Sequence, residues 1–92
     1  MAVATVPDVG DDRDGLKALG ETVKRLRIDR GTGPRGLAFD AEIGEDTLIS
    51  LEEGKTEPRW GTLRRVARAL DVELPEILSK AEELEEETGR GA

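Results

Sequence analysis

The chain has 92 residues, which is enough for one small domain, and it contains neither cysteine nor histidine. This composition excludes disulfide bonds, thiolate metal sites, the usual zinc ligands and the commonest general base. The carboxylates, lysines and serines form no catalytic constellation in the sequence, so we expect no enzyme activity and no cofactor.

The net charge of −7 is carried by the two ends of the chain. Residues 1–14 hold four Asp against one Arg, residues 81–92 hold five Glu against one Arg, and residues 15–80 hold 12 groups of each sign. The first residues lack the basic start and apolar run of a signal peptide, and no segment approaches the roughly 20 apolar residues of a membrane span. These features predict a soluble, cytoplasmic protein with no membrane contact.

Residues 1–14 are small, acidic and aperiodic, and we expect a disordered acidic arm there. A first helix is predicted over residues 15–30, with Asp14 as its N-cap and Gly31 as its stop. Apolar residues recur along this helix at spacings of three and four, namely at Leu16, Leu19, Val23 and Leu26.

Two short helices follow. Pro34 stands at a favourable first helical position, which predicts a second helix over residues 34–41. Residues 42–44 form the next turn, and a third helix is predicted over residues 45–53, with Gly54 at its end. The side chains of these two helices that are expected to face the core are Leu37, Ala38, Ala41, Leu48 and Leu51.

A fourth helix is predicted over residues 59–70, with Trp60 packed at its start, and a fifth helix opens at residues 74–75. No strand is predicted, so residues 15–80 are expected to form one all-α domain of five helices. Residues 81–92 are expected to be an acidic helical extension and tail that frays before Gly89. The apolar stripe of the fifth helix is longer than a core of about 60 residues needs. Its far part is therefore either a dimer seam or covered within the monomer, and the seam residues are Ile77, Ala81 and Leu84.

The order of these elements and the residues between them follow a known pattern. It runs from Leu19-Gly20 through Leu37-Ala38 to the segments LEEGKTEP and TLRRVARALDV, and it ends at Leu78. Over these residues, about two-thirds of the chain and without gaps, the chain resembles the Cro/phage-repressor type of helix-turn-helix regulators, the XRE family. The resemblance implies a five-helix, lambda-repressor-like all-α fold with acidic flexible tails, in which the third helix lies in the DNA major groove.

The resemblance also implies roles for individual residues. The family positions that read bases correspond to Glu45, Asp46, Ile49 and Ser50. The family positions that contact phosphate, on the third helix and in the loop after it, correspond to Thr47, Lys55, Thr56 and Arg59. A family ion pair that locks the third helix to the first corresponds to Arg27 and Glu52.

Two places depart from the family pattern. Family members often carry Arg, Ser, Gln or Thr where this chain has Glu45 and Asp46. The two acids either accept hydrogen bonds from cytosine N4, or repel the duplex and serve a protein partner, or stabilise the first helical turn. The family often has a phosphate-binding Gln where this chain has Pro34, which lacks a donor, so Arg35 is expected to make that contact instead.

The leading interpretation is a sequence-specific, DNA-binding transcriptional regulator of a bacterium or its phage. It would bind double-stranded DNA at a palindromic operator as a homodimer. Fold does not settle function, so an alternative class stays open. This alternative is a protein-interaction module on a helix-turn-helix scaffold (an antitoxin, an anti-repressor or an acidic mimic), whose protein partner docks on the acidic third helix.

Overall fold

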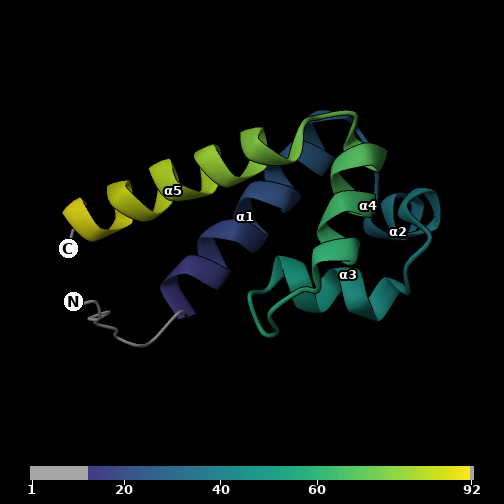
Figure 1. Ribbon diagram of the computed structural model, residues 1–92, viewed down its shortest axis with the longest axis horizontal. Coiled ribbons are helices and arrows are strands. Elements are labelled where there is room, and N and C mark those ends of the chain that lie inside the picture. The colour runs from purple at the N-terminus through teal and green to yellow at the C-terminus, as the bar shows by residue number, and fades with distance from the viewer. Residues whose placement is uncertain (1–12, 92) are drawn as a thin grey trace, which may run out of the picture.

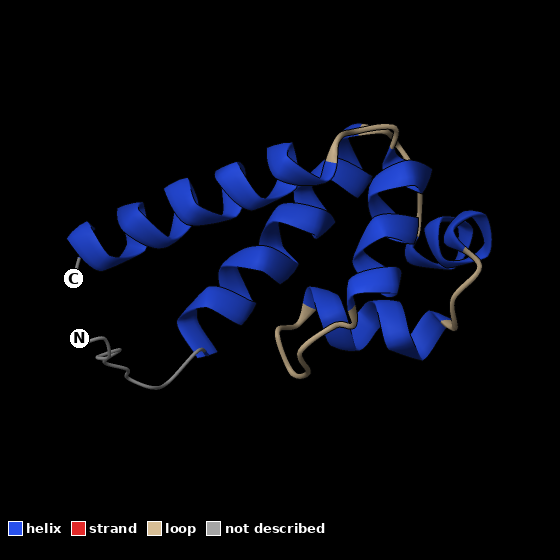
Figure 2. Ribbon diagram, viewed as in Figure 1, coloured by secondary structure: helices blue, strands red, loops and turns tan. Residues whose placement is uncertain are grey.

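The computed structural model describes residues 13–91, with side chains described from residue 13 to residue 87. This part of the chain folds into α1 (Arg13–Asp29), α2 (Pro34–Ala41), α3 (Glu45–Glu52), α4 (Trp60–Leu70) and α5 (Leu74–Gly91) (Figure 1). Short loops join these helices, and residues 13–91 contain no strand (Figure 2). The predicted all-α, five-helix class is therefore confirmed. Of the acidic arm expected at residues 1–14, residues 1–12 lie outside the described part of the chain.

One hydrophobic core joins the helices. α5 lies alongside α1, α3 packs on α1, and α2 packs against both α3 and α4 (Figure 1). Each buried aliphatic side chain stabilises the fold by about 1.5–3 kcal/mol relative to its exposed state. The largest fully buried side chains come from all five helices and are Val23, Leu37, Leu48, Leu51, Val66, Leu70 and Ile77.

Two helices end at residues with left-handed backbone conformation that are not glycine. Glu42 after α2 has a φ of 62°, and Asp71 after α4 has a φ of 61°. In both cases the next residue donates its backbone N–H to the fifth residue before it, as Ile43 does to the Ala38 carbonyl at 3.0 Å. This Schellman-type closure satisfies carbonyl groups that the helix leaves without a partner. It also turns the chain sharply between α2 and α3 and between α4 and α5.

The far part of the apolar stripe on α5 is covered within the monomer, which is the second of the two alternatives predicted for it. Ile77 and Ala81 are buried within the monomer, and Leu84 is half-buried against the same core. The reason is the length of α1, which runs beside α5 and covers the stripe that the sequence left without a partner. α5 also continues to Gly91 instead of fraying before Gly89.

Two large apolar side chains of α4 and α5 are exposed, and one of them, Trp60, was expected to be packed. Trp60 is 63% exposed at the start of α4, and Leu78 is 40% exposed on α5. Other residues of these two helices face the core: Val66 and Leu70 fill the inner face of α4, and Ile77 fills that of α5.

Candidate nucleic-acid interface

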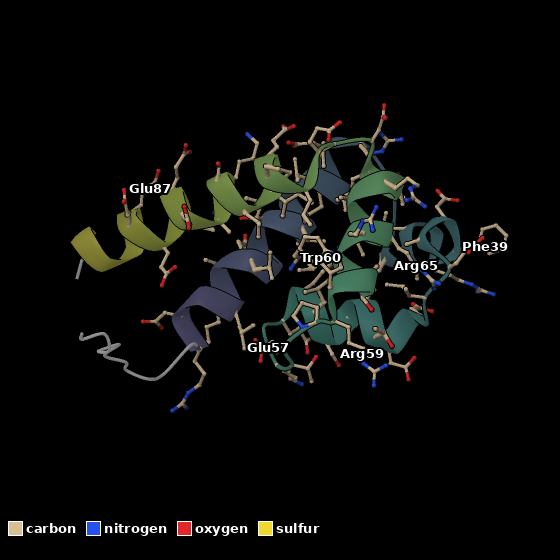
Figure 3. The ribbon with its side chains drawn as sticks, in the orientation of Figure 1. Phe39, Glu57, Arg59, Trp60, Arg65 and Glu87 are labelled. Carbon is tan, nitrogen blue, oxygen red and sulfur yellow. The ribbon has the colours of Figure 1, made fainter. Side chains whose placement is uncertain are left out.

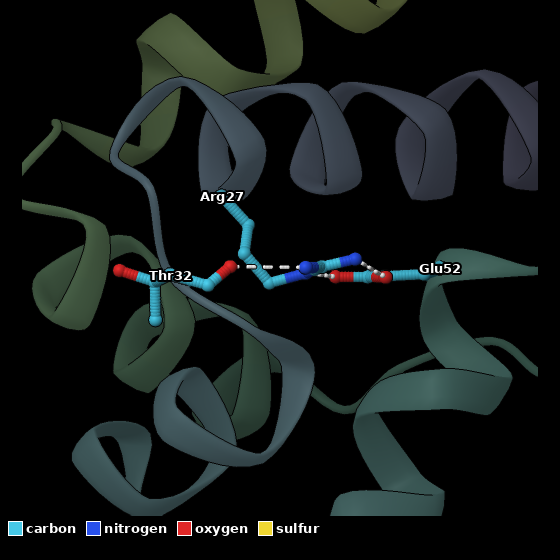
Figure 4. A network of polar contacts seen from close by, with 3 residues as sticks. All are labelled: Arg27, Thr32 and Glu52. Atoms are coloured by element: carbon cyan, nitrogen blue, oxygen red, sulfur yellow. Dashed lines mark hydrogen bonds and ion pairs between the residues drawn. The ribbon is translucent and has the colours of Figure 1, made fainter.

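α3 is anchored to α1 by a buried ion pair (Figure 4). The Arg27 guanidinium donates from Nε and Nη2 to the two carboxylate oxygens of Glu52, at 2.7 and 2.9 Å, and from Nη1 to the Thr32 carbonyl at 3.0 Å. The two side chains are only 9% and 7% exposed. The hydrogen bonds to Glu52 raise the pKa of Arg27 above its usual value, although burial acts in the opposite direction. The arginine therefore ties together α1, the α1–α2 turn and the C-terminal end of α3.

Two glycines allow α1 and α3 to come this close. A Cβ at Gly20 would overlap the Leu51 carbonyl oxygen and would lie 2.5 Å from that of Glu52. Gly54, which follows α3 with a φ of 71°, would place a Cβ 2.8 Å from the Lys17 Cα. Because backbone atoms cannot move aside as a flexible side chain can, glycine at both positions fixes the distance between the two helices.

The outer face of α3 is free of the core. Leu48 and Leu51 point inward and are buried. Ser50 is half-buried, and the residues that are exposed on the outer face are Glu45, Asp46, Thr47 and Ile49. The four predicted base-reading residues, Ser50 included, therefore lie on the same short helix as Thr47. The major groove of B-DNA is about 12 Å wide and can admit such a helix.

The N-terminal end of α3 lacks a side-chain cap. Gly44 occupies the N-cap position and makes no side-chain hydrogen bond, so the first N–H groups of the helix stay open. Glu45 and Asp46 stand in this first turn, where their negative charge interacts favourably with the helix dipole. Helix stabilisation by the two acids is thus compatible with a role on the exposed face.

The loop after α3 brings several predicted phosphate contacts together. A hollow of about 300 Å³ lies between α3, this loop and the start of α4. The predicted contacts Thr47, Thr56 and Arg59 line it, together with Leu51, Glu57, Pro58 and Thr62. Figure 3 shows Arg59 and Glu57 on the α3 side of the molecule. Three hydroxyl donors and one guanidinium around a hollow are suited to an anionic oxygen.

The other two predicted phosphate contacts differ from this group. Lys55 lies in the same loop, but its ammonium pairs with Glu53 at 3.1 Å, and both side chains are exposed. An exposed pair of this kind contributes little, so a phosphate could replace Glu53 at small cost. Arg35 is exposed in the first turn of α2 and makes no hydrogen bond or ion pair within the described residues. The structure does not bring Arg35 into the hollow.

Two arginines that were not predicted as site residues support the helix arrangement. Arg30, in the turn directly after α1, donates to the Leu70 carbonyl at the end of α4 at 3.1 Å. Arg65, on α4, donates to the carbonyl of Glu42 in the α2–α3 turn at 3.2 Å. No sequence signal marks either bond, because both acceptors are backbone atoms of distant helix ends. Arg65 therefore supports the turn that precedes α3.

Other kinds of site find no support in the described residues. No group of three or more acidic side chains within them could hold a metal ion. None of the helices in residues 13–91 combines the length and the apolar composition that a membrane crossing requires. The candidate site within the described residues is the exposed face of α3 together with the loop after it.

Comparison with known proteins gives matches in sequence and in structure. The helix-turn-helix domain family model matches residues 18–78. The crystal structure of the clp gene regulator ClgR from Corynebacterium glutamicum superposes with a TM-score of 0.81 at 26% identity, over 84% of this chain and 82% of that one. None of the curated proteins matches this chain.

Two further structures share the fold. The restriction-modification controller protein C.AhdI from Aeromonas hydrophila has a TM-score of 0.66 and 26% identity, over 67% of this chain and 94% of that one. An HTH_3 family transcriptional regulator from Vibrio cholerae has a TM-score of 0.72 at 22% identity, over 80% of this chain and 42% of that one. At this lower identity the similarity concerns the fold alone.

Proposed function

Because this chain belongs to the helix-turn-helix domain family, and is of the XRE type that its sequence resembles, we propose that it is a sequence-specific, DNA-binding transcriptional regulator. It would bind a palindromic operator as a dimer and act by occupying that site, with no chemistry of its own. The names of the similar proteins ClgR and C.AhdI, a gene regulator and a controller protein, agree with this proposal.

The observation that carries the proposal is the contrast between the two sides of α3. Its inner side is fixed to α1 by the Arg27–Glu52 pair and by the close approach at Gly20. Its outer side is exposed, short and bordered by the hollow that Arg59 lines. A rigid helix with a free outer face can enter a major groove without reorganisation, which favours binding because little conformational entropy is lost.

The acids on this face set the expected base preference. A carboxylate in the major groove accepts a hydrogen bond from cytosine N4, so Glu45 and Asp46 favour cytosines, and Ile49 favours the methyl group of thymine. Repulsion between the acids and the phosphates must be offset by the cations nearby. These cations are Arg35, Lys55 and Arg59, and four acids, Glu45, Asp46, Glu53 and Glu57, stand near them in the sequence. Affinity of a single protomer is therefore expected to be modest, and binding to depend on two protomers acting together.

The test is selection of bound duplexes from a random pool at low salt, with three proteins. Wild type should recover an inverted repeat that contains cytosine. Glu45→Ala should change the recovered bases at one position in each half-site more than it changes the affinity. Glu82→Ala, which removes the same charge from exposed α5, is the matched control and should recover the wild-type sequence.

Two outcomes would overturn the proposal. Glu45→Ala could raise the affinity for every duplex equally, which would mean that Glu45 only repels DNA. Alternatively, folded wild-type protein could recover no sequence at all. The second result would favour the other class of function, a protein partner on the exposed acidic face of α3.

A further inference from the structure

The exposed face of α4 carries an aromatic residue followed by two cations. Trp60, Arg64 and Arg68 are spaced four residues apart, so they lie on one face of the helix. All three are exposed, and Trp60 is the largest exposed apolar side chain among the described residues. Figure 3 shows Trp60 near the middle of the molecule, on the side that faces the viewer.

This face forms one wall of a groove of about 560 Å³ between α4 and the start of α5. The other wall comes from the α4–α5 turn and the first turns of α5, and it contains the apolar residues Leu74, Pro75 and Leu78. The charges of the two walls are opposite. The α4 wall has Arg64 and Arg68, and the opposite wall has Asp71, Glu73 and Glu76.

Within the described residues these charges find no partners of their own. Neither the side chains of the two arginines nor those of the three acids form a hydrogen bond or an ion pair with another described residue. Both walls therefore offer free charge on either side of an apolar strip made by Trp60 and Leu78. A strongly acidic or strongly basic partner would match only one wall.

We propose that a second copy of this chain occupies the groove, related to the first by a two-fold axis. A two-fold axis places the same patch on both sides of the interface and makes every contact reciprocal, so the α4 wall of each copy can meet the α5 wall of the other. The basic α4 wall of one copy then faces the acidic α5 wall of the other, twice, with the Trp60 side chains between them. Self-complementarity of charge favours a second copy over a partner of one charge sign.

The proposal rests on the proposed function and gives a surface to its dimer. α4 runs from the loop beside α3 to the turn that opens α5 (Figure 1). A two-fold axis roughly parallel to α4 leaves the α3 helices of both copies on the same side of the dimer. Both outer faces of α3 then stay available to one duplex, as a palindrome requires.

The dimer is expected to be weak in the absence of DNA. Stable interfaces bury at least about 1,200 Å², and a groove formed by two short helix segments contributes only part of such an area. Dissociation on dilution is therefore measurable. Trp60 is the single Trp of a chain without Tyr, so its fluorescence reports this surface alone.

The first test follows Trp60 emission and sedimentation across roughly 1 µM to 1 mM protein, without DNA. We expect emission to shift to shorter wavelength at high concentration, together with a change from monomer to dimer. Leu78→Ala should weaken dimerisation by at least about 10-fold, because it removes part of the apolar strip. Phe39→Ala removes a more exposed aromatic residue, 81% exposed on α2 outside the groove, and should leave dimerisation unchanged.

The second test exchanges the charges of each wall. Arg64→Glu with Arg68→Glu should give a monomer, and so should Glu73→Arg with Glu76→Arg, because each change sets like charges against each other. An equimolar mixture of the two variants should form a heterodimer, because their altered walls match. Circular dichroism checks that each variant is folded.

Three results would overturn the inference. They are a wild-type protein that stays monomeric at every concentration, variants that dimerise as wild type does, and a mixture that does not associate. Binding of a single half-site duplex is measured in parallel with the same proteins. If the half-site is bound while dimerisation by the groove is absent, this surface is refuted and the proposed DNA-binding function is not.

Discussion

Replacing Arg27 with methionine tests the anchor of α3. Methionine keeps much of the apolar stem but removes the guanidinium and its three hydrogen bonds. The Glu52 carboxylate is then left 7% exposed without its cation, and the Thr32 carbonyl loses its donor. Both consequences act on the same junction of α1, the α1–α2 turn and α3.

The expected loss of stability is large for a domain of this size. Breaking a buried ion pair by removal of one partner costs about 3–5 kcal/mol, since the remaining charge is desolvated without compensation. The free energy of unfolding of domains of this size is roughly 5–15 kcal/mol, so Arg27→Met should remove about a fifth of it or more. Substituting both Arg27 and Glu52 with methionine removes the stranded charge as well, and should lie within about 2 kcal/mol of wild type.

The assay is a double-mutant cycle by urea denaturation, followed by circular dichroism. It compares wild type, Arg27→Met, Glu52→Met and the double variant, and the coupling energy is the departure from additivity. Arg25→Met is the matched control. Arg25 pairs with Glu21 at 3.0 Å on the same helix, but these side chains are 62% and 45% exposed, so its loss should cost no more than about 0.5 kcal/mol.

Additivity would refute the reasoning. If the two single losses add up to the loss in the double variant, the two side chains do not depend on each other. The same conclusion follows if Arg27→Met costs no more than Arg25→Met. Either result would mean that core packing alone holds α3 in place.

Three further predictions concern backbone geometry and DNA. Gly20→Ala should destabilise the fold by about 1–3 kcal/mol, because the added methyl group overlaps α3. Gly61→Ala, in open space on α4, should stabilise the fold by up to about 1 kcal/mol. If urea denaturation gave Gly20→Ala the larger free energy of unfolding of the two, the close contact between α1 and α3 would be contradicted. Glu42→Gly should raise the melting temperature by about 3–6 °C, because glycine accepts the φ of 62° without strain, and an unchanged value would mean that this turn is unstrained. Arg59→Gln should reduce the steepness with which the logarithm of the DNA association constant falls against the logarithm of salt concentration, by about one per protomer. If Arg25→Gln reduced it equally, the effect would not come from a phosphate contact of Arg59.

Helix positions could be predicted from the sequence because local residues decide them. Gly31, Pro34, Gly44 and Gly54 interrupt the apolar periodicity, and the observed bounds of the first four helices lie within two residues of the predicted ones. The pairing of Arg27 with Glu52 was available only through the resemblance to a family, since 25 residues separate the two in sequence.

Features that depend on tertiary packing could not be predicted in the same way. The stripe on α5 seemed unpaired because nothing in its own sequence indicates that α1 lies beside it. Trp60 was expected to be packed because the corresponding family position usually holds a packed aliphatic residue, but Val66 and Leu70 fill the inner face of α4. The left-handed turn at Glu42 carries no glycine that would have marked it.

The most direct test of the central claim, that α3 reads DNA, places a cutting reagent on the protein. The chain has no cysteine, so a single engineered cysteine can carry an iron–EDTA group that cleaves nearby DNA. Glu53→Cys, at the end of α3, should cut the selected duplex within each half-site, and Ser79→Cys, exposed on α5, should leave those positions intact. If both labelled proteins bind the duplex but cut it alike, or if only Ser79→Cys cuts the half-sites, then α3 does not lie in the groove and the account is wrong.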